Sequence, residues 1–201
     1  MSRPVVLLCD PAFPHEGSLP DAHPSALSEI GSVVRADELA QALDGLDGGV
    51  FVNLHAPYFP KSAWTAILAF VRRGGGLISV GGAPFKRPAR RENGRWVVEA
   101  EQTGYHQQLH IHEALRVDGS RAARYEALAE LPLLAGDEGL LPVRDTWNLV
   151  PHVTKSSDHP HQMGSAGPMD TRIYALLKGI SSEGRAVSAP VVLWEHVGGP
   201  F

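Results

Sequence analysis

Residues 49–82 read GVFVNLHAPYFPKSAWTAILAFVRRGGGLISVGG. Two apolar runs, residues 50–54 and 77–80, bracket a segment whose apolar side chains recur at helical spacing: Trp64, Ile67, Leu68 and Val71. The runs predict buried strands, and the spacing between them predicts a helix that begins near Pro60 and ends at the glycines of residues 74–76. The stretch therefore predicts a strand–helix–strand unit, the building block of a parallel sheet.

The residues before this stretch continue the same alternation. Residues 4–9 form an apolar run that predicts a first strand, and residues 32–35 predict a second. A short helix is expected over residues 25–30, with Ser25 as its cap, and another is expected after an N-cap at Asp37. We therefore predict an α/β three-layer sandwich in which helices cover both faces of a mostly parallel central sheet.

After residue 85 the pattern weakens. Residues 86–93 are predicted to form an exposed loop, because they include four basic residues: Lys86, Arg87, Arg90 and Arg91. The alternative is that these residues clamp an anionic ligand near the crevice. A strand at residues 96–98 opens an insertion over roughly residues 86–120. We expect a helix at residues 121–131, mostly loop at 144–172 and a strong strand at 189–194. The whole chain, residues 1–201, is predicted to be one domain and the N-terminal part of a longer protein.

Composition narrows the classes of function. The 201 residues carry a formal net charge of −4, which disfavours a nucleic-acid-binding surface. No apolar run reaches the length of about 20 residues that spans a bilayer, so no membrane partner is expected. A single cysteine excludes an internal disulfide and favours the cytoplasm.

The carboxyl ends of the predicted parallel strands are where a ligand would bind. Four residues follow these strands: Asp10, His55, Gly81 and Gly82. Phe85 comes three residues after Gly82. A carboxylate and an imidazole that face two backbone amides suit an anion or a sugar hydroxyl, and aromatic rings such as Phe85 and Trp96 stack on sugars. The structural alternative is that Asp10 caps a turn, His55 lies in a loop and the aromatic rings anchor the insertion.

Several segments together resemble the class I glutamine amidotransferase-like (flavodoxin-like) fold. They are the strand at residues 5–9, the segment of residues 49–82, and the run Gly81-Gly82-Ala83-Pro84-Phe85 followed by Gly94-Arg95-Trp96. The similarity is to the trehalose-utilisation and glycoside-hydrolase-associated types, and it covers residues 4–96 and the last strand. It implies a role in carbohydrate metabolism. Active members of the family place a cysteine at the turn where this chain has Gly81 and Gly82.

This chain departs from the catalytic pattern of the family at the cysteine and at the His and Glu of the triad. The one cysteine, Cys9, lies in a predicted buried strand, where an apolar environment keeps it a thiol. Amidotransferases take a His and a Glu two residues apart, whereas Glu195 and His196 are adjacent and point to opposite faces of a strand. No catalytic residue is therefore assigned.

Three histidines, His106, His110 and His112, would share one face of a strand, and three imidazoles can hold a catalytic zinc. Leu109 and Ile111 on the opposite face suit an ordinary half-exposed strand equally well. We assign no metal and no cofactor.

Three functions follow. The leading hypothesis is a non-catalytic amidotransferase-like accessory or assembly domain of a carbohydrate-active protein, with a partner domain or a second copy as its partner. The alternative is a stand-alone hydrolase or sugar-binding protein that uses the crevice at Asp10 and His55, with or without a histidine-bound metal. The third is a sensor that binds a carbohydrate or another small molecule there.

Overall fold

A computed structural model describes residues 3–16, 24–109, 113–118, 121–136, 147–152 and 171–196. The chain divides into two compact units, Met1–Leu109 and His110–Pro200, and each is described by itself. The boundary between them falls inside the insertion that the sequence predicts at residues 86–120.

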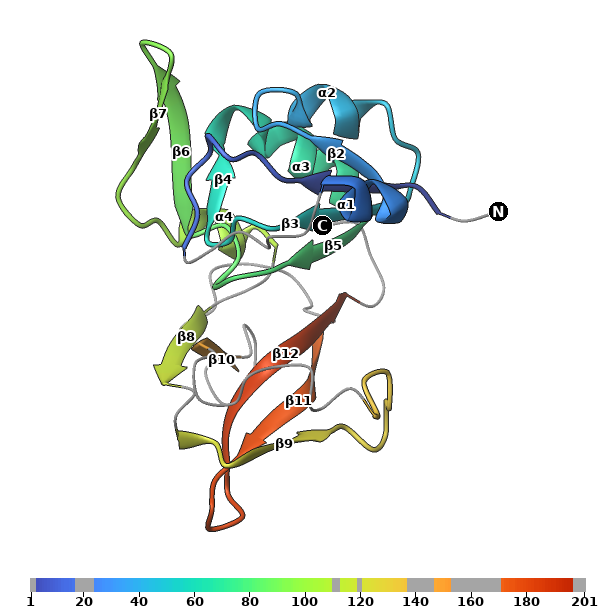
Figure 1. Cartoon of the computed structure of the whole chain (residues 1–201), viewed down its shortest axis with the longest axis vertical. Helices are drawn as coiled ribbons and strands as arrows, with labels where there is room; N and C mark the ends of the chain where they lie inside the picture. The colour runs from blue at the N-terminus through green and yellow to red at the C-terminus, as the bar shows by residue number, and fades with distance from the viewer. Residues whose placement is uncertain are drawn as a thin grey trace. The chain divides into compact units, whose positions relative to one another are not determined.

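The first unit is built on the predicted parallel sheet (Figure 1). Its strands are β1 (Val5–Leu8), β2 (Ser32–Val34), β3 (Val50–Asn53) and β5 (Gly76–Ser79), in the order β2-β1-β3-β5. All neighbouring strands are parallel, with Leu7 opposite both Val33 and Val52, and Val52 opposite Ile78. The α/β class and the parallel sheet are therefore confirmed.

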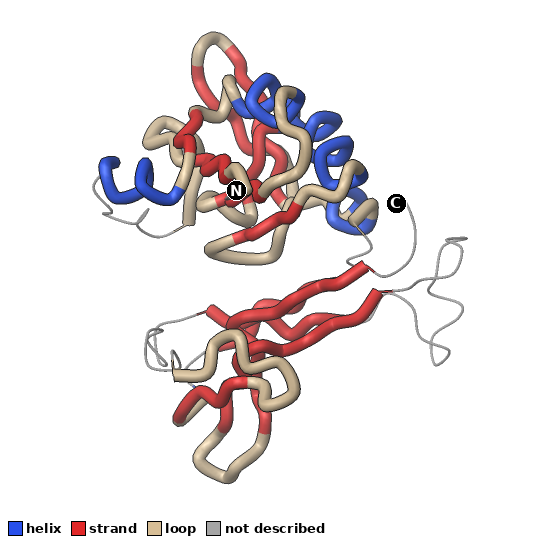
Figure 2. Tube along the Cα trace, turned by 90° about the vertical axis from the view of Figure 1, so that its right-hand side faces the viewer, coloured by secondary structure: helices blue, strands red, loops and turns tan. Residues whose placement is uncertain are grey.

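Helices α1 (Pro24–Ile30), α2 (Leu39–Asp44) and α3 (Trp64–Arg72) connect these strands. Figure 2 shows α1 apart from α2 and α3. The prediction of Asp37 as the cap of α2 is wrong, because Glu38 is the N-cap and makes no side-chain capping bond. Pro60 ends β4 and precedes a 3₁₀ turn, Lys61–Ala63, that leads into α3.

Alternate residues of the strands face opposite sides of the sheet. Leu7 and Val52 pack with Leu27 of α1, which covers the middle of one face. The outer strands are less covered on that face, since Val33 is 37% exposed and Ile78 is 50% exposed. Strand β5 is the last strand of this sheet, and within the described residues its outer side pairs with no other strand.

A three-stranded sheet joins the same unit. It consists of β4 (Tyr58–Pro60), β6 (Arg87–Glu92) and β7 (Arg95–Val98), with β4 parallel to β6 and β6 antiparallel to β7. The strand at residues 96–98 is confirmed. The loop predicted over residues 86–93 is wrong, because most of it is strand β6, in which Pro88 and Ala89 are buried and Arg90 and Arg91 are exposed.

Four aromatic rings form the core under this sheet. Phe59 lies 5.4 Å from Phe85, 5.5 Å from Trp64 and 4.9 Å from Tyr105 between ring centroids. Tyr105 comes from α4 (Gly104–Gln107). Phe85 is fully buried in this cluster, where it anchors the chain between β5 and β6.

The second unit contains an antiparallel sheet, in the order β8-β10-β12-β11-β9. Its strands are β8 (Glu113–Asp118), β9 (Arg124–Ala127), β10 (Trp147–His152), β11 (Thr171–Ile180) and β12 (Ala186–His196). The terminal strand is confirmed, but the helix predicted at residues 121–131 is wrong because β9 occupies that segment and pairs with β11. Strand β10 falls within the predicted loop of residues 144–172.

Of the helices in the described ranges, none is long and apolar enough to cross a membrane.

Candidate ligand-binding cavity in the first unit

Asp10 follows β1 and is almost completely buried. Its two carboxylate oxygens accept backbone N–H groups from two different loops: Oδ1 from Ala12 at 2.9 Å and Oδ2 from Ala36 at 3.2 Å. The first bond shapes the turn after β1, and the second ties that turn to the loop after β2. A buried carboxylate needs such donors, because a charge left without them in a protein interior is costly.

His55 follows β3, and its ring contacts the backbone of Asp10. The backbone N–H of Asp10 donates to Nε2 of His55 at 3.0 Å, and Nδ1 of His55 lies 3.0 Å from the carbonyl oxygen of Pro14. Nε2 must accept and Nδ1 must donate, so this network selects the neutral ring with its proton on Nδ1. Burial lowers the pKa of His55 and is the main cause of the shift, while the hydrogen bond with the Pro14 carbonyl opposes it. The charge of His15 lowers the pKa further, and the charge of Asp10 raises it.

Gly81 and Gly82 lie beside the segment that follows His55. Gly81 has a φ of +107°, and a Cβ built on it would lie 2.9 Å from the carbonyl oxygen of Ala56. A Cβ on Gly82 would lie 3.3 Å from Cδ of Pro57. The chain therefore turns here without room for a side chain at Gly81.

A cavity of about 310 Å³ opens at the carboxyl ends of β1 and β2. Asp10 and Ala12 line it from the first loop, and Arg35 and Asp37 line it from the second. The turn of the β6–β7 hairpin supplies the remaining wall: Arg91, Gly94, Arg95 and Trp96. Of the predicted site residues only Asp10 lines this cavity. His55, Gly81, Gly82 and Phe85 lie outside its lining.

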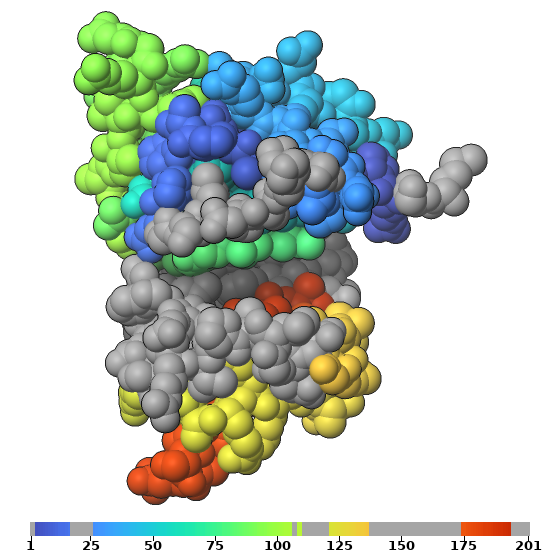
Figure 3. All heavy atoms as spheres, in the orientation of Figure 1, coloured from blue at the N-terminus to red at the C-terminus, as the bar shows by residue number. Residues whose placement is uncertain are grey.

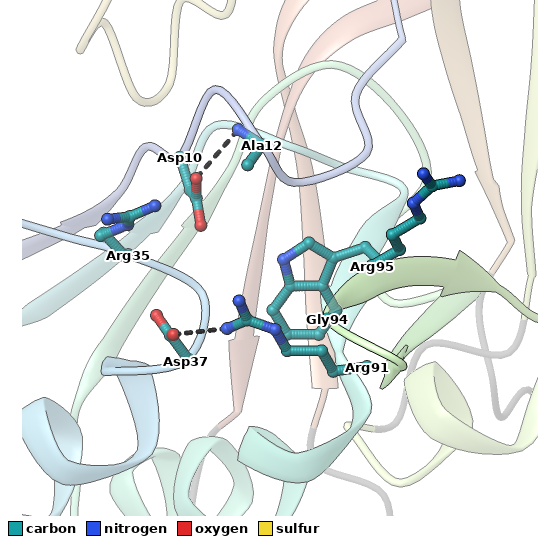
Figure 4. Close-up of a pocket in the computed structure, with 8 residues that line it drawn as sticks. Asp10, Ala12, Arg35, Asp37, Arg91, Gly94 and Arg95 are labelled. Atoms are coloured by element: carbon teal, nitrogen blue, oxygen red, sulfur yellow. Dashed lines mark hydrogen bonds and ion pairs between the residues drawn. The ribbon is translucent and has the colours of Figure 1, made fainter.

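The hairpin is attached to both loops. Arg91 Nη1 lies 2.7 Å from Asp37 Oδ2, as Figure 4 shows, and the Arg91 guanidinium lies 5.8 Å from the ring centroid of Trp96. The Trp96 ring also meets Phe13 edge-on at 4.9 Å, and Phe13 in turn meets His55 at 5.3 Å. Figure 3 shows the segment after β1 (blue) against the hairpin (green) on the surface of this unit.

The sequence offers Arg91 two roles, one of four basic residues that clamp an anionic ligand or part of a solvated loop, and the cavity includes it. It places Arg35 at the end of a strand and gives no binding role to Arg35 or Arg95. The pair Asn93-Gly94 is the signal that identifies the hairpin, because a two-residue turn of type I′ needs positive φ at both positions. The values here are 48° and 80°.

Cys9 directly follows β1, packs on the cluster of Leu7, Leu27 and Val52, and is half-buried. Burial raises the pKa of its thiol, and the neighbouring Asp10 charge raises it further. The thiolate is therefore disfavoured at neutral pH.

No group of three or more metal-binding side chains occurs among the residues with described positions. His110 and His112 lie outside those residues, and His106 lies on α4 rather than on the strand that the three-histidine prediction requires. Glu195 and His196 are consecutive residues of β12.

Comparison of the chain with protein-family models, with curated proteins and with solved structures finds no match.

Proposed function

We propose that the first unit is a non-catalytic, amidotransferase-like domain that serves as an accessory ligand-binding or assembly module of a carbohydrate-active protein. The strand order β2-β1-β3-β5 supports this, because flavodoxin-like folds continue from strands 2-1-3 in the same way. Ligands of such sheets bind beyond the carboxyl ends of the strands, where the cavity lies.

The observation that carries the proposal is the turn after β5. An amidotransferase needs a cysteine at this turn, and Gly81 takes a backbone conformation in which a Cβ would press on the Ala56 carbonyl. A nucleophile therefore has no place at this position.

Two further observations support the same conclusion. The pKa of the Cys9 thiol is raised, which opposes nucleophilic attack. Both ring nitrogens of His55 already have backbone partners, so the ring has no free lone pair to serve as a general base.

The proposal is tested by measuring ammonia release from glutamine, and glycosidase activity on aryl glycosides, with the intact chain. We expect no turnover above the buffer rate and slow modification of Cys9 by a thiol reagent at neutral pH. Turnover that disappears in Cys9→Ser or His55→Gln would contradict the proposal, provided that the circular dichroism of the variant is unchanged.

The alternative of a stand-alone sugar-binding protein or sensor is favoured by one observation, the preformed cavity beside Asp10. It predicts that saturating mono- or disaccharide raises the melting temperature by several degrees. An unchanged melting temperature across neutral and anionic sugars would remove this alternative.

A further inference from the structure

We propose that the cavity between the loops after β1 and β2 and the β6–β7 hairpin binds a small organic anion of monosaccharide size, whose carboxylate or phosphate is held by Arg35 and Arg95. The inference rests on the ligand-binding role proposed above and names the class of ligand.

Charge is the first argument. Three arginines and two aspartates line the cavity, an excess of one positive charge. Arg91 is paired with Asp37, and both oxygens of Asp10 are occupied by backbone N–H groups. In the described part of the chain, no carboxylate pairs with Arg35 or Arg95. An anionic group on the ligand would supply the missing partner.

The chemistry of the side chains is the second argument. A guanidinium presents parallel N–H donors that match the oxygens of a carboxylate or a phosphate, and such charge-assisted hydrogen bonds are stronger than neutral ones. Figure 4 shows Arg35 directed toward Asp10 and Arg95 turned away from it. Arg35 is therefore the primary contact, and the exposed side chain of Arg95 must rotate inward when the ligand enters.

The third argument is that the walls are already in place. The Arg91–Asp37 pair fixes the hairpin to the loop after β2, and the Phe13–Trp96 contact fixes it to the loop after β1. Arg91 and Trp96, which are held in this way, lose little conformational entropy on binding, whereas the exposed side chains of Arg35 and Arg95 become ordered when the ligand binds. The volume of about 310 Å³ lies at the lower end of the usual range for ligand sites, which suits a single sugar ring rather than a nucleotide or an oligosaccharide.

Isothermal titration calorimetry on the intact chain tests this with glucuronate, glucose 6-phosphate and neutral glucose. We expect one or both acids to bind and glucose not to bind. Arg35→Gln should weaken the acid at least about tenfold, and Arg95→Gln about threefold or more. The matched control Arg72→Gln removes the same charge from the end of α3 and should leave the affinity unchanged. A ¹H–¹⁵N spectrum should show the Trp96 indole signal shifting as the acid is added.

Binding of glucuronate alone would identify the group as a carboxylate, and binding of glucose 6-phosphate alone would identify it as a phosphate. Three results would overturn the inference: no binding of either acid, equal affinity for glucose, or an equal loss in Arg72→Gln and Arg35→Gln. None of these results bears on catalysis, which the turnover assay tests. The two experiments therefore show separately whether the ligand proposal or the non-catalytic proposal is wrong.

Discussion

His55 joins two loops through the neutral form of its ring. It accepts the N–H of Asp10 and donates to Pro14, so a second ring proton would have to displace the Asp10 bond. Because the ring is fully buried, the pKa of His55 is lowered from its usual value of 6.5. The same residue that the sequence offers as a ligand group thus holds the backbone of the loop after β1, from which Asp10 lines the cavity.

This lowered pKa predicts a loss of stability in acid. Below pH 6.5 the unfolded chain takes up a proton that the folded chain refuses, so the free energy of unfolding falls by up to about 1.4 kcal/mol per pH unit until the folded-state pKa is reached. Above pH 6.5 the contribution is complete. Urea unfolding followed between about pH 7.5 and about pH 5.5 should show a steeper fall for the native chain than for His55→Gln. Equal slopes would mean that His55 is not protonated differently in the two states.

Two adjacent glycines, Gly48 and Gly49, share a positive φ but differ in the space around them. Gly48 and Gly49 both have positive φ, at 79° and 102°. A Cβ on Gly48 would meet nothing within 4 Å, whereas a Cβ on Gly49 would overlap the Pro4 carbonyl oxygen, which accepts the N–H of Val50.

We therefore expect Gly48→Ala to cost roughly 1 kcal/mol, the strain of a left-handed alanine. Gly49→Ala should cost at least about 3 kcal/mol, because it also separates β1 from β3. Denaturant unfolding of the two variants measures the difference, and similar costs would show that β1 and β3 are not closely paired at this end.

At the level of elements, the β6–β7 hairpin decides whether a cavity exists. It supplies half of the lining residues, and its links to the rest of the unit include the pairing of β6 with β4, the Arg91–Asp37 pair and the Trp96 ring. The ion pair is about half exposed on both sides, so its contribution is expected to be less than about 1 kcal/mol. The Trp96 ring, which packs on Phe13, attaches the hairpin to the loop after β1 and is expected to contribute more than this ion pair.

Replacement of Trp96 by alanine should loosen the hairpin without unfolding the parallel sheet. Hydrogen exchange should accelerate at the paired residues Arg91 and Trp96 while it stays slow at Val6 and Val52. Trp96→Phe, which keeps an aromatic ring, should fall between the native chain and the alanine variant. Uniform acceleration across both sheets would show that the hairpin and the parallel sheet unfold as one.

Local sequence predicts elements of the first unit better than those of the second for a physical reason. Strands β1 and β3 are continuous apolar runs because both faces are buried, and that signal needs no partner to be recognised. In β9 only Tyr125 is buried while Arg124 and Glu126 face solvent, and the spacing of Tyr125, Leu128 and Leu131 imitates a helix. Pairing with β11, about fifty residues later in the chain, decides the outcome.

The candidate site shows the same limit at the scale of the whole molecule. Asp10 and His55 could be predicted to meet because both follow parallel strands, and they do meet. The approach of Arg91 and Trp96 to this site could not be predicted, because it depends on how the β6–β7 hairpin folds back over the loop after β1. No spacing in the sequence encodes that contact.

Among the described residues the parallel sheet has two edge strands, β2 and β5. Among the described residues, the outer backbone groups of β5 pair with no strand, and Ile78 on β5 and Val80 directly after it are about half exposed. An unpaired edge strand with exposed apolar side chains favours the addition of a strand from another molecule when the protein is concentrated. A lysine in place of Ile78 should raise the concentration at which static light scattering first increases. Ile30→Lys, an equally exposed change on α1, should not do so. Clear solutions from the first variant alone would identify the β5 edge as the place where aggregation of the chain begins.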